Sequence, residues 1–144
     1  LGIAGGQYLD LNYEHKKVSK KKITEMEIKK TGKLFSFCCV APLLIQKRTN
    51  KEKKFFETIG SEIGLLFQIA DDLIDYSGQS SVAGKKTKKD EKQGKATLIS
   101  LLGYRNAIKY SHKLILKLNK KIKKYGKKSD DLIDTLDYIL NRNK

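Results

Sequence analysis

Apolar residues recur every three or four positions along almost the whole chain, and this spacing leaves few folds open to it. It places apolar side chains on one face of an α-helix, whereas the two-residue alternation of half-buried strands is scarcely seen. Pro42 is the only proline in 144 residues. The sequence therefore predicts an all-α protein, and its length suits one domain or a part of one.

The first long helix is expected to begin after Ser19, a favourable N-cap residue, and to be disturbed at Pro42. It contains the longest uncharged stretch, residues 34–46, which is shorter than the about 20 apolar residues of a membrane span. We therefore expect a core helix and no membrane span. Cys38 and Cys39 are adjacent in this stretch, which predicts small core residues in a reducing compartment. With no signal or transit segment visible, the expected location is the cytoplasm.

A second helix is predicted from about Phe55 to Tyr76, after a polar connection over residues 47–54. Residues 77–94 are rich in Gly, Ser and Lys and are expected to form a loop. Helices resume at about Ala96, and the last one follows Gly126.

The formal net charge is +15, and lysine carries almost all of the positive charge. Only Arg48, Arg105 and Arg142 supply the guanidinium group that contacts phosphates and bases through two hydrogen bonds. This composition argues against a nucleic-acid partner and suits a solvated lysine surface that attracts small polyanions. A lysine-rich protein that binds nucleic acid or another polyanion is kept as a rival hypothesis.

Asp71 and Asp75 are four residues apart, so a helix places their carboxylates on one face, with Gln68 beside them. Two like charges at this spacing repel, and hard oxygen ligands suit a Mg²⁺ ion that shares its other positions with water and phosphate. The alternative is an acidic helix face that is turned to water.

The same five letters recur at residues 130–134, directly after Ser129. We expect these carboxylates in the first turn of a helix, where the helix dipole favours negative charge, so this second copy is interpreted as structural. The first copy is expected at the C-terminal end of its helix, where the same dipole disfavours it, and therefore calls for a cation.

Of two lysine-containing segments, one follows the first aspartate cluster in the sequence and the other precedes it. Lys85 and Lys95 each follow a glycine, and Lys95 is expected to open a helix, so that ammonium and backbone N–H groups can meet an anion. Lys30-Thr31-Gly32 offers a cation and a hydroxyl beside a residue that permits close approach. Lysine-rich loops are usually solvated surface, and only the proximity to Asp71 favours a functional interpretation here.

Taken in order, these segments resemble the trans-isoprenyl diphosphate synthases, especially bacterial farnesyl diphosphate synthases. The resemblance covers essentially all 144 residues. The segments that carry it are Gly5-Gly6-Gln7-Tyr8-Leu9-Asp10, Lys30-Thr31-Gly32, Phe67 to Asp75, and Gly84 to Thr97. It implies an isoprenoid synthase-type helical bundle in which residues 1–144 form the C-terminal part of a single domain. Because the chain opens at Leu1 without an initiator methionine, we expect the N-terminal part to be missing.

The resemblance also implies the roles of individual residues. Asp71 and Asp75 would bind Mg²⁺ or Mn²⁺. The residues that would contact the allylic diphosphate or steady the reacting prenyl end are Lys30, Thr31, Gln68, Lys85 and Lys95, of which all but Lys95 are expected to be catalytic. The residues that would orient these groups without contacting the ligands are Gln7, Asp10 and Asp72.

The implied reaction joins an allylic diphosphate to isopentenyl diphosphate by ionisation, condensation and elimination, giving farnesyl or, as second choice, geranylgeranyl diphosphate. The first aspartate-rich motif and the isopentenyl diphosphate site of the family are absent, so the chain alone is expected to be inactive. Lys88 and Lys89 stand where the family has glycine and a small residue. A homodimer is expected for the full-length protein, and a non-catalytic subunit that pairs with an active one is the alternative.

Overall fold

A computed structural model describes residues 2–83 and 95–141 of the chain, except for the side chains of residues 78–83. Within these residues every regular element is a helix, which confirms the all-α prediction. The elements in chain order are α1 (Ile3–Asn12), α2 (Lys20–Glu27), a π-helical turn (Ile28–Gly32), α3 (Lys33–Ile45), α4 (Asn50–Ala83), α6 (Leu98–Leu102), α7 (Tyr104–Ile122), a 3₁₀ segment (Lys123–Ser129) and α8 (Asp130–Asn141).

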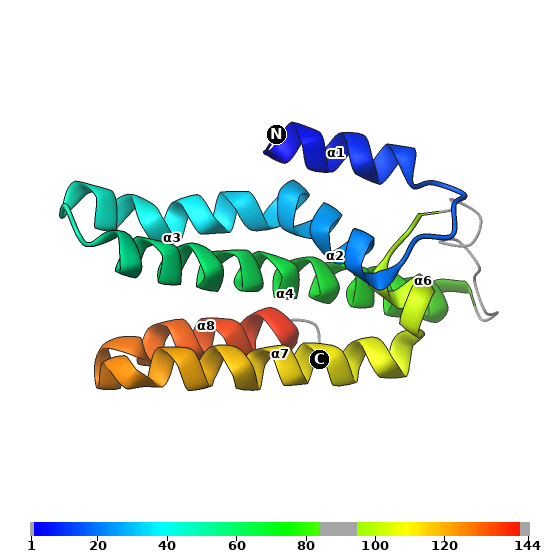
Figure 1. The fold of residues 1–144 in the computed structure, drawn as a ribbon. Coiled ribbons are helices and arrows are strands. Elements are labelled where there is room, and N and C mark those ends of the chain that lie inside the picture. Colours follow the sequence, from blue (N-terminus) through cyan, green and yellow to red (C-terminus); the bar gives the residue numbers. More distant parts are fainter. Residues whose placement is uncertain (1, 84–94, 142–144) are drawn as a thin grey trace.

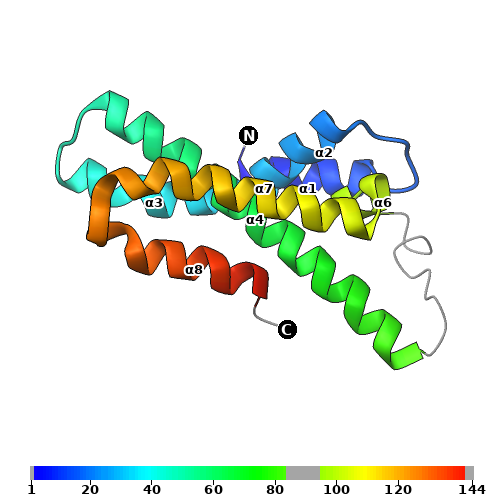
Figure 2. The ribbon, with the colours of Figure 1, turned by 90° about the horizontal axis from the view of Figure 1, so that it is seen from below.

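Helix α4 is the longest element and lies in the middle of the bundle. In Figure 1, α2 and α3 run along one side of α4, α7 and α8 run along the other side, and α1 is outermost beyond α2 and α3. Figure 2 shows that α7 crosses α4 and that α8 lies beside α7. Every layer of the bundle therefore rests directly or indirectly on α4.

The hydrophobic core forms where α2, α4, α6, α7 and α8 meet. Its largest fully buried apolar side chains are Ile23, Met26, Ile59, Leu66, Ile69, Leu98, Leu118 and Leu136. Removing each such side chain from water contributes roughly 1.5–3 kcal/mol to folding. The α4 members of this list are Ile59, Leu66 and Ile69, whose spacings of seven and three residues turn one face of the helix inward.

Glycines let α3 and α4 approach each other at backbone distance. A Cβ atom on Gly60 would lie 2.6 Å from the Cα of Ser36, and one on Gly64 would lie 2.5 Å from the Cα of Gly32. No side chain fits in so little space, so these positions require glycine. The close contact brings the π-helical turn beside the middle of α4.

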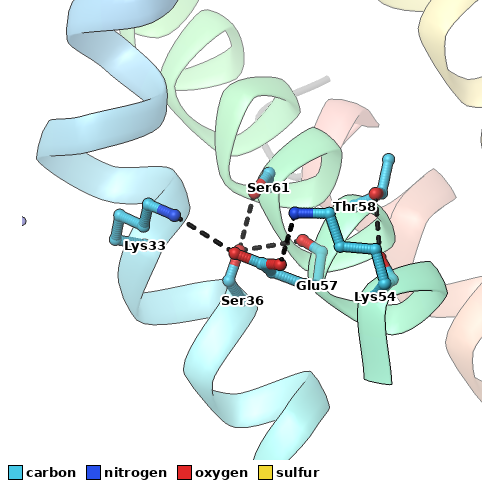
Figure 3. A network of polar contacts seen from close by, with 6 residues as sticks. All are labelled: Lys33, Ser36, Lys54, Glu57, Thr58 and Ser61. Atoms are coloured by element: carbon cyan, nitrogen blue, oxygen red, sulfur yellow. Dashed lines mark hydrogen bonds and ion pairs between the residues drawn. The ribbon is translucent and has the colours of Figure 1, made fainter. Parts of the chain in front are cut away.

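A polar network fastens α3 to α4, as Figure 3 shows. It includes Ser36, the residue against which Gly60 packs. The Ser36 hydroxyl donates to the carbonyl of Glu57 at 2.9 Å and lies 2.7 Å from the Ser61 hydroxyl. The Glu57 carboxylate accepts from Lys54 at 3.0 Å and from Lys33 at 3.3 Å. The Lys54 and Lys33 hydrogen bonds hold the pKa of Glu57 below its ordinary value. This network fixes the orientation of α3 against α4 beside the apolar contact of Phe35 with Phe67.

Helix α4 is longer at both ends than the sequence prediction. It begins at Asn50, because Thr49 and Glu52 form a reciprocal cap: the Thr49 N–H donates to the Glu52 carboxylate at 3.0 Å, and the Glu52 N–H donates to the Thr49 hydroxyl at 3.3 Å. It also continues to Ala83 rather than ending at Tyr76. Residues 50–54 of the predicted polar connection and residues 77–83 of the predicted loop are therefore helical, whereas residues 47–49 form the connection.

The prediction of a core helix over residues 34–46 is wrong. The helix passes through Pro42 and ends at Ile45, but its apolar stripe is exposed. This α3 stripe consists of Leu34, Phe37, Cys38, Leu44 and Ile45. Cys39 is half-buried. The stripe faces outward because α4 covers only the opposite side of α3, and no other described element lies over it. Among the described residues, no helix is both long and apolar enough to cross a bilayer.

Candidate functional site

Helix α1 rests on the backbone of the π-helical turn. A Cβ atom on Gly6 would lie 2.1 Å from the backbone nitrogen of Lys30, so only glycine allows this contact. Asp10 follows one helical turn after Gly6, and its carboxylate accepts a hydrogen bond of 2.7 Å from the Lys30 ammonium group. Isolated π-helical turns of this kind are frequent at functional sites. The first two motifs of the sequence therefore meet at Lys30.

The Lys30–Asp10 ion pair is largely withdrawn from solvent, with side-chain exposures of 27% and 20%. Burial by itself lowers the pKa of Lys30, but the hydrogen bond and charge of Asp10, together with the charges of Glu27 and Asp72, raise it above its ordinary value. Lys30 is therefore a positively charged group held in a fixed place. Such a group suits the recognition of an anion.

A hydrogen-bonded chain links the π-helical turn to the aspartate-rich segment of α4. The Thr31 hydroxyl donates to the Gln68 side-chain oxygen at 3.1 Å, and the Gln68 amide donates to the Asp72 carboxylate at 3.1 Å. All three side chains are half-buried. The second and third motifs are thus joined by side chains rather than only placed near each other.

Glu27 belongs to this cluster and was not predicted from the sequence. Glu27 is 3% exposed, and within the described part of the chain its Oε2 atom has no hydrogen-bond partner. Burial and the repulsion of Asp72 raise its pKa to about 8; the charge of Lys30 lowers it and that of Asp10 raises it further. The available signal was the spacing from Ile23, four residues earlier, which places Glu27 on the inward face of α2.

Asp71 is half-buried and Asp75 is exposed, one turn apart on α4. The helix continues to Ala83, so these carboxylates lie well inside it and not at its C-terminal end. The prediction that the helix dipole disfavours Asp71 and Asp75 is therefore wrong, because the dipole acts only within the last turn. The second copy is placed as predicted, with Asp130 and Asp131 in the first turn of α8.

Two carboxylates fit the needs of a Mg²⁺ ion only in part. Over residues 2–83 and 95–141, no three His, Cys, Asp or Glu side chains gather as a complete metal site. However, Mg²⁺ is commonly held by one or two carboxylates and takes its remaining ligands from phosphate and water. Asp71 and Asp75 are therefore compatible with a metal that arrives together with a diphosphate.

The other predicted site residues are less closely connected to this cluster. Lys95 is exposed and precedes α6, which begins at Leu98 and not at Lys95. The amide of Thr97 already donates to Ser100, and that of Ser100 to Thr97, in a capping box. Gln7 is exposed on α1. Lys85, Lys88 and Lys89 lie outside the described residues.

The chain is similar to known proteins along almost its whole length. Farnesyl diphosphate synthase of Micrococcus luteus is 30% identical over 99% of this chain and 49% of its own length. Geranylgeranyl diphosphate synthase of Cyanophora paradoxa is 33% identical over 99% of this chain and 48% of its own length. The structure of a Helicobacter pylori geranyltransferase, complexed with magnesium and isoprenyl diphosphate, matches with a TM-score of 0.76 and 27% identity over 98% of this chain and 46% of that one.

The chain thus spans about half the length of the curated relatives it matches, and the match lies in their C-terminal half. The neighbouring structures share its isoprenoid synthase helical fold. Residues 1–137 match the polyprenyl synthetase family along almost the whole sequence. On this evidence the chain belongs to the polyprenyl synthetase family.

Proposed function

We propose that the chain provides the diphosphate-binding part of a prenyltransferase that joins an allylic diphosphate to isopentenyl diphosphate. The observation that carries the proposal is the hydrogen-bonded chain from Thr31 through Gln68 to Asp72, which joins the turn that carries Lys30 to the aspartate-rich segment of α4. Relatives named farnesyl and geranylgeranyl diphosphate synthases support the same chemistry. Farnesyl diphosphate is the preferred product, and geranylgeranyl diphosphate is the second choice.

The charged and polar residues of the cluster have separate tasks in this proposal. Lys30 binds the diphosphate, and Asp10 keeps its ammonium group charged and in place. Thr31 and Gln68 hold each other at the reacting end of the prenyl chain. Positive charge that is fixed before the reaction stabilises the negative charge of the departing diphosphate without reorganisation.

Asp71 and Asp75 would hold Mg²⁺ or Mn²⁺, with Asp72 kept in orientation by Gln68. When bound, the metal supplies further positive charge to the diphosphate. Lys85 and Lys95 are proposed as additional diphosphate contacts, and Gln7 as a support of the cluster. These roles are inferred from the motifs, and Lys85 lies outside the described residues.

Residues 1–144 are proposed to form the C-terminal part of one synthase domain and to be inactive alone. Two observations support this: the first aspartate-rich motif is absent from the sequence, and the α3 stripe is uncovered in the described part of the chain. We propose a homodimer for a full-length synthase. The cytoplasmic location stays a prediction from the sequence.

The test is calorimetry of the intact polypeptide with inorganic pyrophosphate, with and without Mg²⁺. Binding is expected only with Mg²⁺, and Asp71→Asn is expected to weaken it at least tenfold. The repeated motif offers a matched control, because Asp130→Asn changes the corresponding letter of the structural copy and should leave binding unchanged. Equal loss in both variants, or no binding by the wild type, would refute the proposal.

Calorimetry and an assay of product formation together separate the rival hypotheses. A lysine-rich polyanion binder would retain pyrophosphate in Asp71→Asn, would not need Mg²⁺, and would lose affinity steeply with salt. If the chain is a non-catalytic subunit, it would still bind pyrophosphate with Mg²⁺, but it would form no product when combined with the N-terminal part of a relative. An active synthase part would form product in that combination.

A further inference from the structure

We propose that Glu27 is a positioning residue of the diphosphate site, whose buried carboxyl retains a proton and so leaves the charge of Lys30 available to the bound diphosphate. The inference rests on the proposed function, since the diphosphate is its ligand. Neither the motifs nor the resemblance assigns a role to Glu27.

The carboxyl group of Glu27 is buried at the end of α2. Glu27 is the last residue of α2, directly before the π-helical turn, and it precedes Lys30 by three residues. The residue is 3% exposed, and no group among residues 2–83 and 95–141 forms a hydrogen bond with its Oε2 atom. An ionised carboxylate is costly in such a place unless it is paired, so the neutral acid is the stable form.

Charged side chains from three neighbouring elements act on the Glu27 carboxyl group. The elements packed against α2 are α1, the π-helical turn, α4 and α6. They contribute Asp10 from α1, Lys30 from the turn and Asp72 from α4, whereas α6 (Leu98–Leu102) has no titratable side chain. Two carboxylates therefore already surround one ammonium group. Ionised Glu27 would be a third negative charge beside it.

The protonation state of Glu27 then affects the binding of diphosphate by Lys30. With neutral Glu27, the Lys30 charge is opposed by Asp10 and Asp72 only, and an arriving diphosphate can share it. With ionised Glu27, the cluster holds Lys30 more tightly and repels the diphosphate. The pKa of about 8 places this change just above neutral pH. Diphosphate affinity should therefore fall as the pH rises through this range, by about tenfold between pH 7 and pH 9 if only the protonated form binds.

The test is calorimetric titration of the full chain with inorganic pyrophosphate and Mg²⁺ at pH 7, 8 and 9. Wild type is compared with Glu27→Gln, which keeps the size and a neutral group, and with Glu25→Gln, which removes an exposed charge from the same helix. The titration of pyrophosphate itself is common to all three proteins and cancels in their ratios. Wild type and Glu25→Gln should lose about tenfold more affinity than Glu27→Gln over this range.

A further variant separates positioning from a merely structural role. Glu27→Ala removes the buried carboxyl group and should weaken pyrophosphate binding at every pH. Glu27→Gln should instead bind pyrophosphate with the affinity that the wild type has at pH 7. Identical pH profiles in wild type and Glu27→Gln would overturn the inference and leave the proposed function intact. Absence of Mg²⁺-dependent binding in the wild type at all three pH values would refute the proposed function.

A measurement on the wild-type protein makes the test independent of how the variants fold. Carbon-13 NMR of the Glu27 carboxyl group should show it still protonated at pH 7. A Glu27 carboxyl signal that is already that of the ionised group at pH 7 would overturn the inference, even if no variant could be purified.

Discussion

Gly6 lies directly against the backbone of Lys30, so closely that a Cβ atom on Gly6 would be 2.1 Å from the Lys30 nitrogen. This contact sets the distance between α1 and the π-helical turn. It also determines whether Asp10, one turn further along α1, can reach the Lys30 ammonium group. The integrity of the candidate site therefore depends on a residue without a side chain.

Gly6→Ala should destabilise the chain by about 2 kcal/mol or more, because the new methyl group forces α1 away from the turn. It should also break the Lys30–Asp10 ion pair. The measurement is urea denaturation followed by circular dichroism. Gly2→Ala is the control, since a Cβ atom there meets no atom within 4 Å, and its effect should stay within about 0.5 kcal/mol. Equal stabilities of the two variants would contradict the close contact.

Asp10→Asn should destabilise the folded chain by about 2 kcal/mol at pH 7, because it leaves the largely buried Lys30 charge without its carboxylate. The pKa of Lys30 should fall, since the hydrogen bond and charge of Asp10 are what raise it against burial. Denaturation and NMR titration of the Lys30 side chain check the two effects. Glu25→Gln removes an exposed charge from the adjacent helix and should change neither quantity.

Thr31→Val and Gln68→Leu should be non-additive, because the two side chains share a hydrogen bond of 3.1 Å. In a double-mutant cycle of unfolding free energies, we expect a coupling of about 1 kcal/mol. Pairing Gln68→Leu with Thr135→Val gives the control, since Thr135 on α8 bonds only to its own helix. A coupling near zero in both cycles would show that the Thr31–Gln68 bond contributes nothing to stability.

The helices and their buried faces were predictable where local chemistry decides them. Ser19 caps α2 as expected, accepting a hydrogen bond from the Lys22 amide. Asp130 and Asp131 lie in the first turn of α8, where the dipole favours them. The cap of α4 by Thr49 was also readable, because a Thr followed three residues later by Glu is a capping box, but the many lysines around it suggested a connection instead.

Features that depend on distant contacts were not predictable. The α3 stripe carries the pattern of a core helix, but no other described element covers it, and a periodic pattern cannot show which neighbour is present. Helix α4 passes through Ser77 and Gly78 because extending an existing helix costs far less than starting one. Glu27 is buried because elements distant in sequence, α1, α4 and α6, pack around α2 together with the π-helical turn.

Glu27→Gln should alter the pH dependence of stability with a definite sign. The pKa of this carboxyl is about 8 in the folded chain and near 4.5 when unfolded, so the folded chain binds the proton more tightly. Wild type therefore loses stability as the pH rises from about 5 to 8, whereas the variant lacks this loss. In urea denaturation the difference between them should change by roughly 1.4 kcal/mol per pH unit in this range and level off above it. A constant difference would mean that Glu27 is ionised at its ordinary pKa and that the cluster around Lys30 carries one more negative charge than inferred.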